Sequence, residues 1–231
     1  MNTLGVGNKN IGLEYVLDLN FFDVLRYKQA GVAVWQRIKA SPDWRFVAVI
    51  IPIMALLQLI GPEYFRYERD WDSSGEIWRL VTAHWVHVGW MHLLLNGLGL
   101  VVCVSLTSPG WSPKRWLVST LIMAIGISTL VTLFNPEVQD YAGHSGILYG
   151  LYVLGAISLF PRDRLIAILV IAAIVTKVLM EQFHFYDFNT GAMIGARVIV
   201  DAHLYGLLMA IAIALIWATY TMNHSPTRQS N

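Results

Sequence analysis

Residues Gly143 to Gly150 read Gly-His-Ser-Gly-Ile-Leu-Tyr-Gly and mark the point where a loop passes into an apolar run. The run that begins at Ser145 extends only to about residue 160. A membrane-spanning helix needs about 20 residues, so this run predicts a helix that starts below the membrane surface. Non-helical backbone before such a helix is tolerated only where it is buried in protein or faces a water-filled cavity. We therefore expect Ser145, held between two glycines, to lie at membrane depth with a reactive hydroxyl.

The composition of the whole chain is that of a membrane protein. Among 231 residues, 56% are hydrophobic and only 13% are charged, and the mean hydropathy is +0.53. These values are far from those of soluble domains. The net charge of +1 and the lack of a basic run argue against a nucleic-acid partner and leave the lipid bilayer as the expected environment.

Six apolar stretches are long enough, or nearly so, to cross a bilayer as helices. They predict an all-α, polytopic bundle of six transmembrane helices, forming one domain over residues 44–222. Residues 1–43 are expected to be either a basic helix on the membrane surface or a partly disordered leader, and residues 223–231 a short tail. The predicted spans cover approximately residues 44–61, 89–107, 114–134, 145–160, 164–182 and 198–222.

The basic residues give these spans an orientation. Among those outside the spans or at their ends, only Arg66, Arg69, Arg79 and Arg197 fall on the side away from the termini. Because basic residues accumulate in cytoplasmic segments, we expect both termini in the cytoplasm. The even-numbered spans then begin near the outer face.

Four polar side chains are predicted to meet at that outer depth. His92 and Asn96 open the second span, Ser145 opens the fourth, and His203 lies near the start of the sixth. Polar groups inside a membrane are costly, so their convergence predicts a functional site.

The residue types suggest acyl transfer. A serine hydroxyl becomes a nucleophile when a neutral imidazole takes its proton, and His203 is best placed to do so for Ser145. Tyr149 follows Ser145 by one helical turn and is expected to stack on the imidazole, orienting it in place of a third polar group. Asp201 is two residues from His203 and points elsewhere on a helix, so it is not assigned as an acid.

Small residues predict that the fourth and sixth spans touch. Gly146 and Gly150 lie four apart on one span, as do Gly206 and Ala210 on the other. Such spacing lets helix backbones approach closely.

The developing oxyanion also needs hydrogen-bond donors. The Ser145 amide at a helix start, the Asn96 amide and the His92 imidazole are the candidates.

Each of these residues also has a simpler interpretation. A serine at a helix start is usually an N-cap, a lone histidine usually packs or donates a hydrogen bond, and an Asn often joins helices. A metal site at His84, His87 and His92 is disfavoured, because their spacing gives no single helical face and no carboxylate or cysteine completes the set. No metal or cofactor is expected.

Three separated motifs resemble those of rhomboid intramembrane serine proteases. The first contains Trp78-Arg79, then His87, and then the His92-to-Asn96 pair with three residues between. The second is Gly143-His144-Ser145-Gly146 with Tyr149 at the histidine-stacking position, and the third is Ala202-His203 followed by Gly206. The three lie in order on the predicted helices.

The resemblance implies that Ser145 is the nucleophile and His203 the general base, with His92, Asn96 and the Ser145 amide around the oxyanion. It implies cleavage of a transmembrane segment of a client protein near the outer face of a bacterial inner membrane. The active site would open to the periplasmic or outer side, without a cofactor. A cap over the site would contain Phe183, Phe185, Tyr186, Phe188 and Met193.

The histidine of Gly-His-Ser-Gly and the six-span core look similar to the rhombosortase subfamily, which implies clients with C-terminal Gly-Gly sorting helices. Asp201 and the Leu204-Tyr205-Gly206 sequence depart from common rhomboid patterns, which leaves the subfamily open. The alternative function is a catalytically silent rhomboid-like adaptor or chaperone that binds transmembrane helices. A small transporter is weaker, because no inverted repeat stands out. The sequence gives no oligomeric state.

Overall fold

The computed structural model describes residues 44–107, 111–185 and 190–224, and the side chains only as far as residue 219. The predicted leader 1–43 and most of the predicted tail, together with Tyr186 and Phe188 of the predicted cap, lie outside the described residues.

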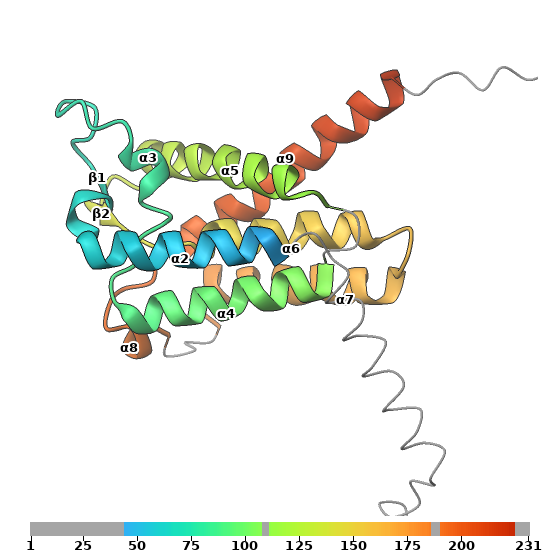
Figure 1. Cartoon of the computed structure of the whole chain (residues 1–231), viewed down its shortest axis with the longest axis horizontal. Helices are drawn as coiled ribbons and strands as arrows, with labels where there is room; N and C mark the ends of the chain where they lie inside the picture. The colour runs from blue at the N-terminus through green and yellow to red at the C-terminus, as the bar shows by residue number, and fades with distance from the viewer. Residues whose placement is uncertain (1–43, 108–110, 186–189, 225–231) are drawn as a thin grey trace, which may run out of the picture. The chain divides into compact units, whose positions relative to one another are not determined.

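Six apolar helices dominate the structure (Figure 1). Their ends lie within two residues of the predicted span limits. Four of them, α4, α5, α7 and α9, are long and apolar enough to cross a membrane, and α2 and α6 are shorter apolar helices. The chain is therefore a multi-pass membrane protein built as a helical bundle. The helices are α2 (Trp44–Ile60), α4 (Trp90–Thr107), α5 (Pro113–Phe134), α6 (Ser145–Leu159), α7 (Arg164–Gln182) and α9 (Val200–His224).

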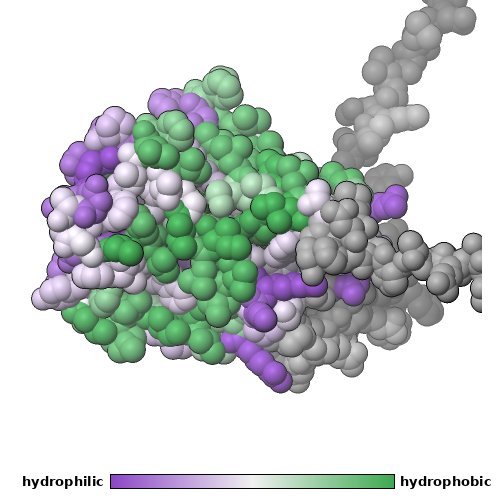
Figure 2. All heavy atoms as spheres, turned by 90° about the horizontal axis from the view of Figure 1, so that it is seen from above, coloured by the Kyte–Doolittle hydropathy of each residue, from purple (hydrophilic) through white to green (hydrophobic). Residues whose placement is uncertain are grey.

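The surface of the bundle carries the side chains that a bilayer requires. Large apolar residues on α2, α5, α7 and α9 are more than half exposed, among them Leu59, Leu133, Leu165 and Leu215. Figure 2 shows hydrophobic residues covering much of the face that it presents. In water such a continuous apolar surface would be unfavourable, whereas lipid tails solvate it.

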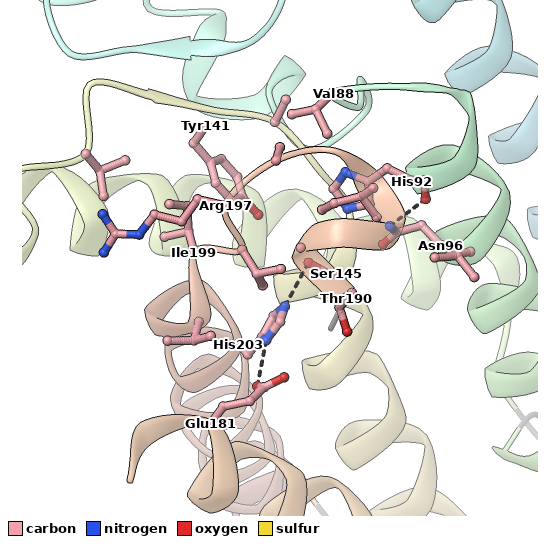
Figure 3. A pocket seen from close by; sticks show the side chains of 18 of the residues that line it. Val88, His92, Asn96, Tyr141, Ser145, Glu181, Thr190, Arg197, Ile199 and His203 are labelled. Atoms are coloured by element: carbon pink, nitrogen blue, oxygen red, sulfur yellow. Dashed lines mark hydrogen bonds and ion pairs between the residues drawn. The ribbon is translucent and has the colours of Figure 1, made fainter. Parts of the chain in front are cut away.

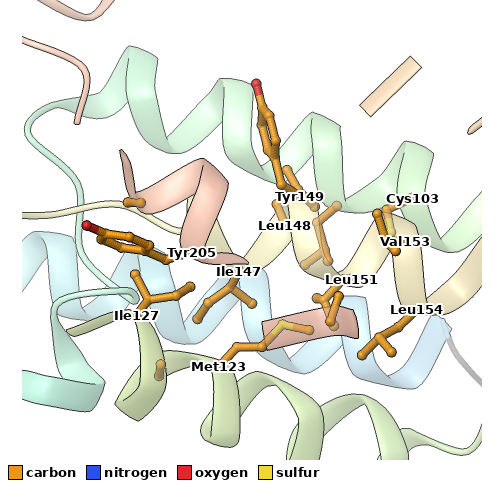
Figure 4. Close-up of a cluster of buried hydrophobic side chains, with 14 of the residues drawn as sticks. Cys103, Met123, Ile127, Ile147, Leu148, Tyr149, Leu151, Val153, Leu154 and Tyr205 are labelled. Carbon is orange, nitrogen blue, oxygen red and sulfur yellow. The ribbon is translucent and has the colours of Figure 1, made fainter. Parts of the chain in front are cut away.

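Helix α6 is the centre of the bundle. It is apolar all round, and its residues are buried on nearly every side against α4, α5, α7 and α9 (Figure 4). A helix that is hydrophobic all round is expected to be buried, and here neighbouring helices cover it. Its 15 residues need not cross the bilayer alone, because protein surrounds them.

Glycines bring α6 and α9 into backbone contact. A Cβ on Gly150 would lie 2.6 Å from the Gly206 carbonyl oxygen, and one on Gly146 would lie 2.7 Å from the Ala202 oxygen. Neither distance leaves room for a side chain. The close approach predicted from the small residues is confirmed.

The segment between α2 and α4 is folded rather than extended. It contains the short 3-10 helix η2 (Pro62–Tyr64), strand β1 (Tyr67–Glu68) and helix α3 (Arg79–Thr82). Strand β1 pairs antiparallel with β2 (Asp140–Tyr141), just before Gly143. This pairing ties the segment to the loop that leads into α6.

Arg79 holds that segment together from a buried position. Its guanidinium donates to the carbonyl oxygens of Glu63 at 3.0 Å and Arg66 at 2.7 Å, and to the Glu76 carboxylate at 2.9 Å. The neighbouring Trp78 is half exposed. Trp78 and Arg79 do not line the cavity next to Ser145. They can therefore support a site there only by holding the segment between α2 and α4 in place.

Candidate active site

Ser145 is the first residue of α6 and follows a turn made at Gly143. Gly143 has a φ of 145°, a backbone conformation that favours glycine, and a Cβ at this position would lie 2.6 Å from the His92 ring. His144 is the N-cap residue, without a side-chain capping bond. Ser145 is therefore not an N-cap, and its hydroxyl is available for another partner.

That partner is His203 on α9. Its Nε2 lies 2.9 Å from the Ser145 Oγ, and the histidine is 4% exposed (Figure 3). The two side chains come from the pair of helices that the glycines bring together. The structure thus joins two residues separated by 58 positions in the sequence.

A carboxylate that the sequence analysis missed lies on the other side of the imidazole. Glu181, at the end of α7, has Oε2 2.8 Å from the His203 Nδ1. A carboxylate accepts hydrogen bonds, so Nδ1 carries the proton and Nε2 has the free lone pair. In this tautomer Nε2 accepts from the Ser145 hydroxyl, which is the arrangement that a general base needs.

Tyr149 stacks on His203 as expected, with ring centroids 4.2 Å apart and planes 10° apart. Its hydroxyl also donates to Glu181 Oε1 at 3.2 Å, and Lys177 donates to the same oxygen at 2.7 Å. The prediction that Tyr149 replaces a third polar group is therefore wrong, because the stack and a carboxylate are both present. Asp201 faces away, as expected, and accepts from Asn135 at 2.6 Å.

The oxyanion candidates border the same cavity as Ser145 and His203. This open cavity of about 1040 Å³ is lined by His92 and Asn96 on α4. One N–H of the Asn96 side-chain amide donates to the His92 carbonyl oxygen at 2.9 Å. The second N–H of that amide is left to donate to an oxyanion. The Ser145 amide lies in the first turn of α6, where N–H groups have no intrahelical acceptor.

Buried polar groups fix the loop that carries Ser145. The Gly143 amide donates to the Ala83 oxygen at 3.0 Å, and His144 Nδ1 donates to the His84 oxygen at the same distance. Tyr141 donates to the Gly143 oxygen at 2.8 Å. Burial lowers the pKa of His144 to about 4, and burial together with the neighbouring His144 lowers that of His84 to about 3. Both histidines are therefore neutral at neutral pH.

His84, His87 and His92, which are close in the sequence, are not arranged as metal ligands. His84 contacts the Ser128 hydroxyl through Nε2 at 3.0 Å, and the His87 ring packs edge-on against His92. Burial, with His92 and His144 nearby, lowers the pKa of His87 well below its usual value. Within the described ranges, no three His, Cys, Asp or Glu side chains are arranged to hold a metal ion.

The segment between α7 and α9 borders another part of the cavity. Thr190, Gly191 and Ile194 of the short helix α8 (Thr190–Ile194) line it, followed by residues 196–200. Of the predicted cap residues, Phe183, Phe185 and Met193 are strongly exposed, and none of the three lines the cavity.

Comparison with known proteins agrees with this architecture. A family model described as a Rhomboid domain matches residues 74–220. The chain is 34% identical over 91 residues to Rhomboid-like protease 5 of Toxoplasma gondii, covering 39% of this chain and 10% of that protein. It is 25% identical to Rhomboid protease GluP of Bacillus subtilis, covering 88% of this chain and 45% of that protein. The chain thus spans less than half the length of either relative. With its family model matching well over half of its residues, the chain belongs to the rhomboid family.

Proposed function

We propose that this protein is an intramembrane serine endopeptidase that cleaves a transmembrane segment of a client protein. The single observation that carries the proposal is the 2.9 Å contact between the Ser145 hydroxyl and His203 Nε2, in a cavity inside an apolar bundle. Membership of the rhomboid family supports the same reaction class, as does similarity to one protein named a rhomboid-like protease and one named a rhomboid protease.

The reaction begins when Ser145 Oγ attacks the scissile carbonyl carbon while His203 Nε2 takes the hydroxyl proton. The resulting oxyanion accepts hydrogen bonds from the Ser145 amide and from Asn96, and from His92 if its tautomer presents an N–H. His203 then gives its proton to the leaving amine, and an acyl-enzyme ester on Ser145 remains. Water, activated by His203, hydrolyses the ester and restores the serine.

The site is proposed to open toward the outer face of a bacterial inner membrane, with both termini in the cytoplasm. The distribution of basic residues supports this orientation. The partners are then the lipid bilayer and a transmembrane client, and water enters from the outer side.

A narrower substrate class is proposed from the Gly-His-Ser-Gly sequence at residues 143–146, which resembles that of rhombosortases. The two glycines of a C-terminal Gly-Gly sorting helix weaken that helix by roughly 1 kcal/mol each relative to alanine, which favours local unwinding at the bond to be cleaved. Proteomics of C-terminal membrane anchors, with active and inactive enzyme, distinguishes this class from general cleavage. Loss of processing restricted to Gly-Gly helices supports it, and cleavage of unrelated segments contradicts it.

Catalysis itself is tested by cleavage of a transmembrane substrate in reconstituted membranes. Ser145→Ala and His203→Ala are expected to abolish cleavage while both variants remain folded. Ser105→Ala is the matched control, because Ser105 is exposed on α4 and, in the part of the chain that the structure describes, its hydroxyl bonds the Val101 oxygen of its own helix. Retained cleavage by either site variant would contradict the mechanism, and a wild-type protein that binds helices without cleaving them would favour the adaptor.

A further inference from the structure

We infer that Glu181 is a positioning residue for His203, so that the site works as a Ser145–His203–Glu181 triad rather than as a pair. This inference rests on the proposed function and adds a third group to it. The geometry is that of a serine triad, in which an acid bonds one imidazole nitrogen and the nucleophile bonds the other. Here the two contacts are 2.8 Å and 2.9 Å.

The first task of Glu181 is to select the tautomer. A neutral imidazole carries one N–H, and the carboxylate can only accept, so the hydrogen is held on Nδ1. Nε2 is then free for the Ser145 proton. Without Glu181, stacking on Tyr149 would still orient the ring plane but would not distinguish the two nitrogens.

The second task is electrostatic. When Nε2 takes the serine proton, His203 becomes an imidazolium beside an ionised carboxylate, and Nδ1 keeps its hydrogen throughout. The Glu181 side chain is 10% exposed and that of His203 is 6% exposed. Both side chains are largely buried, so their charge interaction is stronger than that of a fully exposed pair.

Glu181 is itself held in the orientation that this role needs. Lys177 and Tyr149 both donate to Oε1, and Oε2 is left for His203. Lys177 and Glu181 are one helical turn apart and could pair simply to stabilise α7. Such a pair would not require Glu181 Oε2 to contact the imidazole of His203. The division of the two oxygens favours a role in the site.

Other charged or titratable groups surround His203 and the cavity. Among the described residues, those that line the cavity besides Glu181 and His203 are His92, Glu137, Asp140, Tyr141, Tyr149, Lys177, His184 and Arg197. Asp201, on α9 itself, faces away from it and accepts a hydrogen bond from Asn135. All of them are retained when only Glu181 is changed. A change in pH dependence in a Glu181 variant therefore reports the loss of this carboxylate.

The test measures the rate of fluorophosphonate labelling of the full-length protein as a function of pH. Glu181→Gln is expected to lower the rate at neutral pH by at least about tenfold, since loss of the acid in serine proteases costs about 10⁴-fold and Tyr149 still stacks here. It should also move the acid limb of the profile to lower pH, because the imidazolium loses its anionic partner. Asp201→Asn, the matched carboxylate control on α9, is expected to change the rate by less than about twofold.

Lys177→Met provides a second measurement if Glu181→Gln does not fold. Lys177 is partly exposed, and its removal leaves Glu181 with less compensating positive charge. The acid limb is then expected to move to higher pH, opposite to the Glu181→Gln shift. An unchanged acid limb in the folded variant, or equal effects of Glu181→Gln and Asp201→Asn, would overturn the inference. A wild-type protein that fails to label would instead contradict the proposed function.

Discussion

The backbone of Gly206 on α9 lies directly against the carbonyl oxygen of Gly146 on α6, and a Cβ on Gly206 would overlap that oxygen. This contact holds the helix that carries His203 against the helix that begins at Ser145. The distance between the Ser145 and His203 side chains therefore depends on Gly146 and Gly206, which have no side chains.

Gly206→Ala is expected to force α6 and α9 apart and to lower both stability and cleavage. Overpacking costs about 1–3 kcal/mol, and backbone atoms on both sides leave little freedom to adjust. Alanine is favoured over glycine in a helix by roughly 1 kcal/mol, so any loss of stability must come from the clash and not from helix propensity. Thermal unfolding and cleavage in the same membrane mimic measure both effects. Gly97→Ala is the control, because its Cβ would make an ordinary 3.7 Å contact with Ile51, and a drop equal to that of Gly206→Ala would contradict this prediction.

Asn96→Ala is expected to lower kcat by about 100-fold with little change in KM, because an oxyanion donor acts mainly in the transition state. The control is Leu94→Ala, which shortens an exposed side chain on the same helix. Steady-state kinetics on one transmembrane substrate separate the two parameters. A wild-type kcat in Asn96→Ala would remove Asn96 from the oxyanion site.

Acidification is expected to destabilise the loop that carries Ser145. Burial lowers the pKa of His84 to about 3 and that of His144 to about 4, whereas an unfolded histidine titrates near about 6.5. Between those values the unfolded state binds more protons, so stability is full above about pH 6.5 and decreases as the pH falls toward 4. Thermal unfolding from pH 7.5 to 4.5 measures the slope. His144→Gln should make the slope shallower, and an unchanged slope would assign the acid sensitivity to other groups.

Arg79→Ala is expected to loosen the segment between α2 and α4. The substitution removes charge-assisted bonds to the carbonyl oxygens of Glu63 and Arg66, each worth about 1.5–3 kcal/mol when buried. It also removes the bond to the partly exposed Glu76 carboxylate. Faster limited proteolysis within residues 62–88 should report the change. Arg66→Ala is the control, since its ion pairs are partly exposed and worth at most about 1 kcal/mol. Equal protease sensitivity of the two variants would contradict a special role for Arg79.

The sequence predicted the helices and most of the site because membrane burial leaves a strong pattern. Long apolar runs predicted each helix within two residues, and the shared depth of alternate span starts predicted that Ser145 and His203 lie together, as their 2.9 Å contact confirms. The small residues on α6 and α9 correctly indicated close packing.

Glu181 was missed because only the starts of even-numbered spans were compared. The end of the preceding odd-numbered span reaches the same side of the membrane, and Glu181 lies there, one turn after Lys177. Charged residues in an apolar helix are costly and usually functional, so the pair was a recognisable signal.

The folded segment between α2 and α4 could not be predicted in the same way. Strands β1 and β2 contain two residues each and pair across about seventy positions, too short to show a period in the sequence. Likewise, the acceptors of Arg79 are mostly backbone carbonyls, which carry no sequence signature.

The most direct test of the central claim is mass-spectrometric mapping of a fluorophosphonate adduct on the wild-type protein in membranes. The Ser145–His203 geometry predicts one adduct on Ser145 and its loss in His203→Ala. The absence of an adduct on Ser145 in the folded wild type, or undiminished labelling in His203→Ala, would contradict a serine protease mechanism.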